Sequence, residues 1–533
     1  MPLDRIRTMA SLGARATKAM WDVGALRPVR PDRAVRLPLP YFRYGPVPAT
    51  VEAMAALRFP RRTALIDERG TLTHAELDRR AAGLAAALRA RLSRPGERVG
   101  VLCRNHRGFV EAVLAASRLG NDVVLLNTDF SGAQLGEVAR REGVGLLIHD
   151  AEFDPVVDEA GLGGPRIHAW HDGTGAHETI DDLAGTAPLR PRPERPSRVI
   201  VMTSGTTGTP KGARHDLSLG SLLPVALSHM VRVPVRSGAP IVVAPPLFHV
   251  LGFAYMSVAL GTGMPLVLFR RFDPKQILDA IEEHGAETLV AVPVMLRRLL
   301  DVPDGPRPAS LRVVVCGGSA LHPHLSEAFM DAFGEVVHNV YGATETGWAT
   351  IATPRDAREA PGTVGRPSFR ITVRILDGDG NELPAGEVGE IHTGGGLRFA
   401  GYTGGGGKRV RDGLTGSGDL GHFDAAGRLF VDGRADDMIV SGGENVFPAE
   451  VEDLLGGHPG VAEVAVTGVD DERWGQRLAA YVVRAPGATV TGDDLKDLVK
   501  RRLARYKAPR DVHFVDELPR TGTGKIRTRA LPT

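Results

Sequence analysis

Residues 202–212 combine hydroxyl side chains, glycines and one lysine, a combination that suits a phosphate group. Glycines let the backbone approach a bulky anion, hydroxyl groups donate hydrogen bonds to it, and a lysine adds positive charge. The spacing differs from a Walker loop, because Pro210 and Gly212 stand where that motif needs Gly and Ser/Thr. A surface loop of turn formers fits the same composition. The candidate phosphate-binding residues are Thr203, Ser204, Gly205, Thr206, Thr207, Gly208 and Lys211.

Two later turns carry groups that suit a nucleotide and a metal ion. Residues 311–316 predict a buried strand that ends in a glycine turn. Residues 340–347 place an aromatic ring, hydroxyl groups and one carboxylate close together in the chain. The Tyr341 ring can stack on a base, and the Glu345 carboxylate can bind a metal ion. The candidates from both turns are Gly317, Gly318, Ser319, Tyr341, Gly342, Thr344 and Glu345.

Four isolated side chains complete the set of candidates. His249 precedes an apolar helix-like segment, Asp419 and Arg434 follow glycines, and Lys525 ends a glycine-rich loop. For each of these side chains, the residue type alone also fits an ordinary structural role. A lone histidine among apolar residues is most often a core residue, an aspartate in a glycine-rich turn is usually a turn residue, and arginine or lysine is usually solvated.

These residues must be positioned by strands and helices that alternate from residue 64 onward. Thr73 and Glu76 form a capping-box pattern for a helix that continues to about Arg91. Alternation of this kind is typical of a doubly wound α/β fold, in which ligands collect at the carboxyl ends of parallel strands. We expect strands at 99–103, 123–126 and 198–201 and helices at 109–119 and 131–142.

The character of the sequence changes twice more. After residue 365, short strands and tight turns without helices predict an all-β subregion. Residues 436–533 predict a separate small α+β domain. The predicted fold is therefore an α/β protein with a large N-terminal domain, residues 46–435, that contains doubly wound mixed sheets and a β subregion, followed by this C-terminal domain.

Residues 1–45 form a basic arm. Nine arginines and lysines face three aspartates: Arg5, Arg7, Arg15, Lys18, Arg27, Arg30, Arg33, Arg36 and Arg43 against Asp4, Asp22 and Asp32. Because the apolar stripe of this segment is thin, we expect the arm to pack on the first domain. Peripheral contact with an anionic membrane surface is the alternative.

Bulk composition restricts the class of protein. A chain of 533 residues with 43% apolar residues can build more than one core. The net charge of +2 gives no electrostatic case for nucleic acid as a partner. Cys103 and Cys316 lie in predicted buried strands, which favours free thiols and a reducing cytoplasm. No apolar run is long enough to span a membrane or to serve as a signal peptide.

The candidate motifs gain specificity from their order along the chain. Read together, they resemble the adenylate-forming superfamily, which contains acyl-CoA synthetases, carrier-protein adenylation domains and luciferases. The resemblance covers nearly the whole chain from about residue 46. Within the superfamily, the chain is most similar to actinobacterial fatty-acyl-CoA synthetases, through residues 105–109, 124–130 and 438–448.

The resemblance implies a nucleotide-binding role for most of these residues. The 203–211 loop would hold the β- and γ-phosphates of ATP and release pyrophosphate. Asp419 would accept hydrogen bonds from the ribose hydroxyls, and Arg434 would lie beside it. Thr344 would contact the α-phosphate and Glu345 would hold Mg²⁺. The adenine would lie among Gly317, Gly318, Ser319, Tyr341 and Gly342.

The resemblance also implies a two-step reaction in one site. Carboxylate and ATP give an acyl-adenylate, with Lys525 at the attacked α-phosphate, and a thiolate then displaces AMP. The C-terminal domain is expected to be mobile and to rotate between the steps about a hinge at Asp436. The rotation would exchange Lys525 for Gly442 and Gly443, which let the pantetheine arm of CoA pass. His249 would border the acyl pocket.

The leading hypothesis is a cytoplasmic ligase that joins a medium- or long-chain fatty acid to CoA. Residues 250–260 and 292–299, with Trp348, would line the acyl tunnel, or Trp348 would shorten it. One alternative is adenylation of a non-fatty acid, either an aryl acid or nitrite in an ATP-dependent diazotase. Another is an acyl-AMP ligase that loads a carrier protein. The predicted partners are the small-molecule acid, ATP and CoA, with a carrier protein and a second copy of the chain as further candidates.

Overall fold

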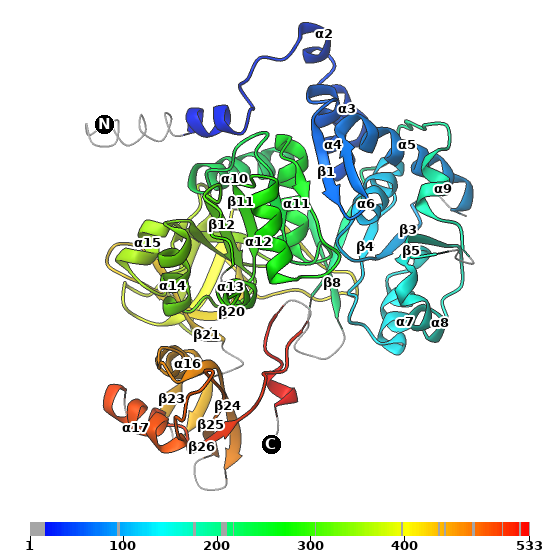
Figure 1. Cartoon of the computed structure of the whole chain (residues 1–533). Helices are drawn as coiled ribbons and strands as arrows, with labels where there is room; N and C mark the ends of the chain where they lie inside the picture. Colours follow the sequence, from blue (N-terminus) through cyan, green and yellow to red (C-terminus); the bar gives the residue numbers. More distant parts are fainter. Residues whose placement is uncertain are drawn as a thin grey trace.

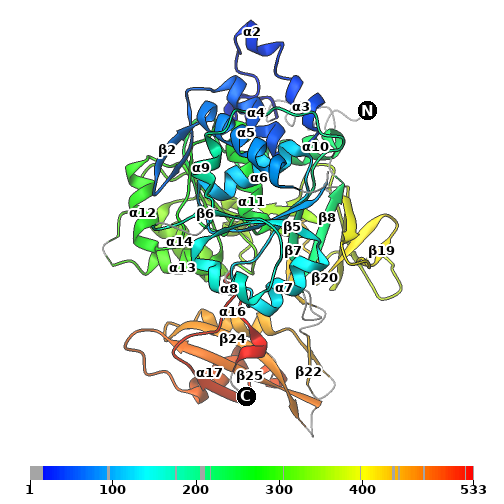
Figure 2. The same ribbon diagram turned by 90° about the vertical axis from the view of Figure 1, so that its right-hand side faces the viewer.

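The computed structural model describes residues 16–92, 96–173, 177–203, 210–216, 218–303, 305–395, 398–434, 438–441, 444–471, 475–503, 505–521 and 524–531. Residues up to Arg434 form a large body, and residues from Ile439 onward form a smaller α+β unit beneath it (Figures 1 and 2). The predicted α/β fold class is confirmed. The exact domain boundaries at residues 45 and 435 stay predictions.

One sheet of the body has nine strands in the described part of the chain. Its order is β15-β14-β13-β12-β11-β9-β10-β1-β2, parallel from β13 to β1, with antiparallel strands at both edges. The bounds are β15 Arg366–Pro367, β14 Gly347–Ala352, β13 Val337–Ala343, β12 Val313–Gly317, β11 Thr288–Ala291, β9 Ile241–Val243, β10 Leu266–Val267, β1 Thr63–Asp67 and β2 Gly70–Thr73.

The other large sheet has the order β18-β8-β7-β4-β3-β5-β6. It is parallel from β7 to β6, and β8 and β18 are antiparallel additions. The bounds are β18 Arg398–Tyr402, β8 Lys211–Asp216, β7 Val199–Thr203, β4 Val123–Leu125, β3 Arg98–Leu102, β5 Val144–Asp150 and β6 Arg166–Trp170. Both large sheets are therefore mixed, as predicted.

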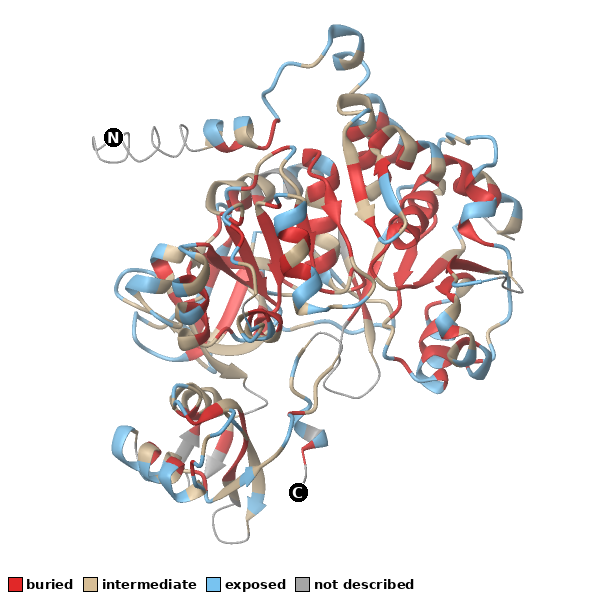
Figure 3. Ribbon diagram, in the orientation of Figure 1, coloured by how far each residue is buried: buried red, intermediate tan, exposed pale blue. Residues whose placement is uncertain are grey.

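Helices cover the sheets, and in the seven-stranded sheet alternate side chains of the central strands enter different cores. Val99 and Val101 of β3 belong to the main core, which extends across both large sheets, whereas Leu102 joins a second core under α7 and α8. Buried residues accordingly fill the strands and inner helix faces (Figure 3). The helices are α4 Pro48–Arg58, α5 His74–Arg91, α6 Arg107–Leu119, α7 Gly132–Arg141, α8 Asp154–Glu159, α9 Ile180–Ala184, α10 Leu219–Arg232, α11 Val250–Thr262, α12 Pro274–Glu283, α13 Pro293–Leu300, α14 Pro323–Phe333 and α15 Pro354–Glu359.

Local sequence signals set several of these boundaries. The capping box at the start of α5 is present, since the Thr73 hydroxyl accepts from the Glu76 backbone N–H and the Glu76 carboxylate accepts from the Thr73 N–H. Ser131 caps α7 in the same way. Cys103 and Cys316 are buried free thiols, as predicted.

The predicted β subregion is an antiparallel sheet of order β16-β17-β20-β19, with β21 beside β20. One strand of this stretch leaves it: β18 pairs with β8 of the seven-stranded sheet. No local sequence pattern indicated this pairing, because strand pairing depends on distant parts of the chain. The bounds are β16 Thr372–Leu376, β17 Gly389–Gly394, β19 Val410–Arg411, β20 Leu414–Phe423 and β21 Leu429–Arg434.

The C-terminal unit has its own sheet and core. Its strands follow the order β23-β22-β25-β24, with β26 parallel to β25, and its buried apolar residues form a separate cluster. The bounds are β22 Ile439–Ser441, β23 Glu444–Val446, α16 Pro448–Gly456, β24 Val461–Asp471, β25 Gly475–Arg484, α17 Gly492–Arg502 and β26 Asp511–Phe514.

The described part of the N-terminal arm contains the short helices α2 (Pro31–Ala34) and α3 (Leu39–Tyr44). Val23 is buried and belongs to the main core, whereas Val35 and Phe42 are 76% and 74% exposed. Residues 1–15, which carry part of the predicted apolar stripe, lie outside the described residues. Among the described helices, none has the length and apolar character needed to cross a membrane.

A buried ion pair joins the two large sheets. Asp67 ends β1 of the nine-stranded sheet, and Arg107 begins α6, which packs on the seven-stranded sheet. The Asp67 carboxylate accepts from the Arg107 backbone N–H at 2.9 Å and from its Nε at 3.0 Å, and the guanidinium also donates to the Gly70 carbonyl at 2.8 Å. An anion at a helix N-terminus adds a favourable dipole interaction.

Replacing Asp67 with Ala leaves the Arg107 guanidinium buried without its counter-ion. We therefore expect Asp67→Ala to lower the free energy of unfolding by about 3–5 kcal/mol, measured from the first urea transition by tryptophan fluorescence. The control is Asp279→Ala, which removes the exposed partner of Lys275 and should change the same quantity by less than about 1 kcal/mol. Equal effects in the two variants would contradict a structural role for the buried pair.

Candidate active site

The candidate phosphate loop is the turn of a β-hairpin. Strands β7 and β8 pair antiparallel with Val201 opposite Ala213, Met202 opposite Gly212 and Thr203 opposite Lys211. This ladder fixes both ends of the loop. The predicted residues Ser204, Gly205, Thr206, Thr207 and Gly208 lie outside the described residues, as does the Thr203 side chain.

The predicted adenine-binding turn lies at the carboxyl end of β12. A Cβ on Gly317 would stand 2.7 Å from the Val340 carbonyl oxygen, so the close approach of β13 requires glycine there. Gly318 has φ +87°, and Ser319 is half-buried. On the neighbouring hairpin, a Cβ on Gly342 would meet the Gly347 carbonyl. Both glycines thus pack β12, β13 and β14 tightly beside the Tyr341–Glu345 segment.

Tyr341, Asp419 and Arg434 come together from three strands. The Tyr341 hydroxyl donates to Asp419 Oδ2 at 2.7 Å, and Arg434 Nη1 lies 3.5 Å from Asp419 Oδ1. Asp419 and Arg434 are register partners on β20 and β21, which sets this second contact. Burial raises the pKa of the Tyr341 phenol, and the Asp419 charge raises it further, so the phenol stays a donor. The predicted ribose pair is thus adjacent to the predicted adenine ring partner.

Glu345 has a partner that the sequence did not reveal. The Tyr402 hydroxyl donates to Glu345 Oε1 at 2.6 Å, and Lys211 Nζ lies 5.5 Å from the centre of the Tyr402 ring. Tyr402 is the last residue of β18, the strand that leaves the β subregion. It therefore links the base of the phosphate loop to the candidate metal ligand.

His249 is held at the start of α11 by a buried loop. Asn105 donates to the Pro245 carbonyl at 2.9 Å and accepts from the Leu247 backbone N–H at 2.8 Å, which fixes the turn before His249. Burial lowers the pKa of His249 to about 3, and the charge of Lys525 contributes to this shift, so the imidazole is neutral. Its Nε2 is buried and has no hydrogen-bond partner among the described residues.

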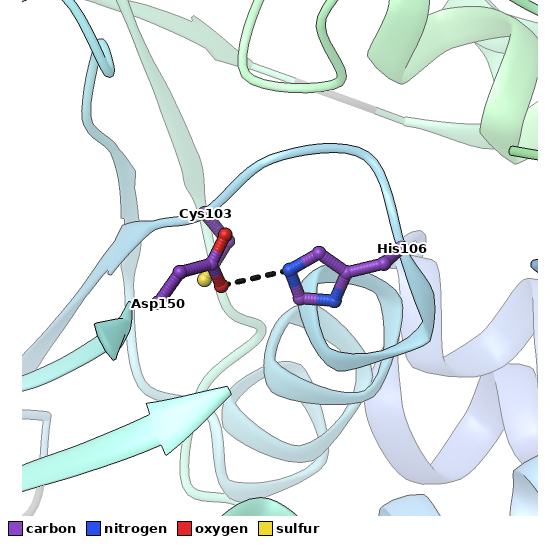
Figure 4. A group of neighbouring side chains, drawn as sticks. All are labelled: Cys103, His106 and Asp150. Carbon is purple, nitrogen blue, oxygen red and sulfur yellow. Dashed lines mark hydrogen bonds and ion pairs between the residues drawn. The ribbon is translucent and has the colours of Figure 1, made fainter. Parts of the chain in front are cut away.

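The segment that carries Asn105 is anchored by a buried group of side chains (Figure 4). His106 Nδ1 accepts from the Gly108 backbone N–H at 3.0 Å, so Nε2 carries the proton and donates to Asp150 Oδ1 at 2.7 Å. Asp150 Oδ2 accepts from the Arg104 backbone N–H at 2.9 Å. Burial raises the pKa of the neighbouring Cys103 thiol, which is therefore inert.

Lys525 reaches the body from the C-terminal unit. Its loop is closed by a bond from the Thr521 N–H to the Lys525 carbonyl at 2.8 Å and by one from the Lys525 N–H to the Thr521 hydroxyl at 3.2 Å. Gly524 has φ +78°, and a Cβ there would stand 2.5 Å from Val294 Cγ1 in α13. The loop that carries Lys525 therefore packs against the body and requires a glycine to do so.

The charges of the site converge around Lys525. Partial burial lowers the pKa of Lys525, and the charge of Arg434 lowers it further. The charges of Asp419 and Glu345 raise it. The residue remains exposed to solvent despite the protein atoms around it, so we expect solvent to screen these interactions. Cationic Lys525, Arg434 and nearby Lys211 would suit a polyphosphate.

Most predicted site residues thus meet in one place. Thr344 lies beside Glu345 on the β13–β14 turn, and Lys525 and Arg434 interact with Asp419 there. Gly442 and Gly443, predicted for CoA, and Asp436, predicted as the hinge, lie outside the described residues. Sequence reasoning missed Tyr402 as a partner of Glu345, because no local pattern reports a contact across 57 residues.

Behind the site lies a cluster of three rings whose mutual contacts the sequence did not predict, although Trp348 was named as a residue of the acyl tunnel. His229 of α10 stacks on Trp348 of β14, with ring centres 4.4 Å apart and an interplanar angle of 21°. The Tyr255 hydroxyl of α11 lies 2.6 Å from His229 Nε2. Burial lowers the pKa of His229 to about 3, so its ring is neutral. These three rings pack α10, α11 and β14 together.

Family comparisons agree with this geometry. Residues 53–403 match the AMP-binding enzyme family, and residues 450–525 match the C-terminal domain of AMP-binding enzymes. The chain belongs to the AMP-binding enzyme family. The predicted adenylate-forming superfamily and the predicted class of AMP-forming, acyl-CoA synthetase-like ligases are thereby confirmed.

Individual relatives of this family member differ in their named substrates. The chain is 36% identical over 475 residues to a feruloyl-CoA synthase of a Streptomyces species, covering 88% of this chain and 94% of that protein. It is 33% identical over 484 residues to a fatty acid–[acyl-carrier-protein] ligase of Streptomyces coeruleorubidus, covering 89% and 93%. The structure of Bacillus subtilis o-succinylbenzoate CoA synthetase with its acyl-adenylate intermediate matches with a TM-score of 0.80 at 32% identity, covering 91% and 98%.

One ion pair connects the C-terminal unit to the body near this site. His322, the N-cap residue of α14, pairs with Asp453 of α16. Burial acts to lower the pKa of His322, but hydrogen bonding and charge from Asp453, with the charge of Glu452, outweigh it, so the pKa is raised. Arg297 acts in the lowering direction, and the ring of His324 stacks on His322.

This contact should depend on pH. Because the pKa of His322 is raised, its contribution is fully present below about pH 6.5 and is lost as pH rises through the raised pKa. Asp453→Asn removes the partner charge and should lower the His322 pKa, as measured by NMR titration. The control Asp432→Asn removes the partner of His422 and should leave His322 unchanged. An unaltered His322 titration in Asp453→Asn would disprove the assignment.

Proposed function

We propose that this enzyme joins a carboxylic acid to CoA in two steps, through an acyl-adenylate. In the first step the acid attacks the α-phosphate of ATP and pyrophosphate leaves, and in the second the CoA thiolate attacks the acyl carbon and AMP leaves. The observation that carries this proposal is the position of Lys525. It comes from the C-terminal unit and interacts with Asp419, Arg434 and Glu345 of the body.

The first step needs the nucleotide and the acid to be held in line. The Tyr341 ring and the glycine turn after β12 would receive adenine, and the Asp419 carboxylate would accept hydrogen bonds from both ribose hydroxyls. The hairpin loop before Lys211 would hold the leaving pyrophosphate. Lys525 would stabilise the charge that builds up between the carboxylate and the α-phosphate.

The donor set also fits Mg²⁺, which prefers carboxylate and phosphate oxygens. Glu345 is the candidate ligand, and the hydrogen bond from Tyr402 to its Oε1 orients the carboxylate. When bound, Mg²⁺ would neutralise part of the phosphate charge. Thr344, beside Glu345, would donate to the α-phosphate.

The second step calls for a different arrangement of the C-terminal unit. The contacts between the body and this unit include the His322–Asp453 pair and the Gly524–Val294 contact, and each of these two is small enough to separate. We infer that rotation withdraws Lys525 and brings the segment containing Gly442 and Gly443 to the site, as the family resemblance implies. The acceptor is then CoA, with a carrier protein as the alternative acceptor.

The acid itself is best proposed as compact, such as an aryl acid. From a carboxylate beside Lys525 and His249, the remainder of the acid would extend along α11 toward Tyr255. There the stacked Trp348 and His229 rings, fixed by the 2.6 Å contact with Tyr255, would limit its length. The feruloyl-CoA synthase relative supports this proposal, whereas the fatty acid ligase relative supports a medium- or long-chain acid.

Lys525→Ala separates the two half-reactions. Loss of one preorganised cation should slow acid-dependent pyrophosphate exchange by about 10²–10³-fold, while transfer from supplied acyl-adenylate to CoA is unchanged. The matched control is Lys275→Ala, a lysine exposed on α12, which should affect neither. Equal loss of both half-reactions in Lys525→Ala would refute its assigned role.

A panel of acids tests the proposed substrate class. We expect pyrophosphate exchange with aryl acids to exceed that with palmitate in the wild type, and Trp348→Ala to shift the preference toward longer acids by at least about tenfold, since the shortened side chain opens space. Trp21→Ala, which alters an exposed tryptophan, is the control. Faster exchange with palmitate in the wild type would favour the fatty-acid assignment, and exchange with nitrite alone would overturn both.

A further inference from the structure

A group of histidines outside the nucleotide site lies at one edge of the seven-stranded sheet. His149 of β5 and His168 of β6 are register partners on neighbouring parallel strands. Asp154 starts α8 after a short 3-10 helix, Ala151–Phe153, that follows β5, and His177 lies in the connection after β6. The side chains of His149 and His168 are almost completely buried, at 0% and 1% exposure.

The donor atoms of this group are as close together as metal ligands. His168 Nε2 lies 2.9 Å and His149 Nδ1 lies 3.6 Å from the same Asp154 oxygen, Oδ1. One ligand atom from each of the three residues lies within 4.8 Å of the others. Ligands about 2.0–2.1 Å from a tetrahedral Zn²⁺ are separated by about 3.3 Å, so these distances are close to those of such a site.

The third histidine ring has a compatible position. The ring centres of His168 and His177 are 4.9 Å apart, those of His149 and His168 are 5.0 Å apart, and those of His149 and His177 are 6.4 Å apart. Two imidazoles bound to one Zn²⁺ at the tetrahedral angle have ring centres about 5 Å apart. His177 can therefore supply a fourth ligand without a change of fold.

The two buried rings are not satisfied by protein atoms. His149 Nδ1 lies 3.1 Å from the Asp150 carbonyl, and His168 Nε2 contacts Asp154, so each of these nitrogens faces an acceptor. The opposite nitrogens, His149 Nε2 and His168 Nδ1, are buried and have no partner among the described residues. A neutral imidazole has one N–H and one lone pair. When the unpartnered nitrogen of a ring carries the proton, the ring directs the lone pair of His149 Nδ1 or His168 Nε2 toward Asp154.

The neighbouring group of Cys103, His106 and Asp150 provides a contrast (Figure 4). There both Asp150 oxygens accept hydrogen bonds and both His106 nitrogens are engaged, so a metal would have to displace existing contacts. In the His149 group, one nitrogen of each buried ring has no partner among the described residues. That nitrogen can carry the proton while the other nitrogen of the ring binds a metal.

We propose that His149, His168 and Asp154, with His177, bind one divalent transition-metal ion of the Zn²⁺ class. The role is structural. Strand β6 is four strands from β7, about 19 Å at the usual strand spacing, so the ion is separate from the nucleotide site. It would fasten the edge strand β6 and its following connection to β5 and α8, an effect that does not require catalysis.

Metal content of the untagged full-length protein tests the proposal. Protein stripped with a chelator, incubated with Zn²⁺ and desalted should retain one zinc per chain by mass spectrometry, and the zinc should raise Tm reversibly. His149→Ala and His168→Ala should lose both effects. Asp154→Asn and His177→Ala change less buried positions, so they remain informative if the first two variants fail to fold. Each should weaken zinc affinity at least about tenfold.

The matched control is His422→Ala, since His422 is partly buried and pairs with Asp432 outside the group. It should retain one zinc with unchanged affinity. Absence of tightly bound zinc in the wild type would overturn the proposal. So would zinc binding that persists unchanged in Asp154→Asn and His177→Ala, because the ion would then lie elsewhere.

Discussion

The antiparallel pairing of β18 with β8 is the constraint on which the assembled site depends. It takes a strand from the β subregion and adds it to the seven-stranded sheet, next to the hairpin that carries the candidate phosphate loop. The ladder ends at Tyr402, whose hydroxyl then meets Glu345 of the nine-stranded sheet. Three sheets are thereby brought to one place, and the charged side chains between them are positioned by main-chain hydrogen bonds.

Near this junction, two histidines and one lysine differ in how far they are buried, and their charge differs accordingly. His249 and His229 are kept neutral by burial, whereas Lys525 remains exposed to solvent at the end of its loop. A cation beside buried neutral rings suits the proposed reaction, in which charge develops at phosphorus and the acid must pass an apolar surface. The same scaffold can therefore serve acids of different shape, as the relatives with different named substrates illustrate.

Rigid buried networks support these groups from behind. Asp150 holds His106 and the backbone of Arg104, and the adjoining Asn105 holds the turn that precedes His249. Such networks are costly to leave incomplete in a low-dielectric interior. The bonds from Asn105 explain why His249 occupies a defined position although it follows a loop.

The sequence by itself determined what short-range chemistry controls. Capping residues such as Thr73 set helix starts, and β-branched runs set strands. The order of glycine-containing motifs identified the family and predicted the residues of its nucleotide site. Only the tertiary structure decided which distant residues meet: Tyr402 with Glu345, His229 with Trp348, and His149 with His168. The physical reason is that strand register and sheet order arise from packing of the whole chain, which leaves no periodic signal in any local segment.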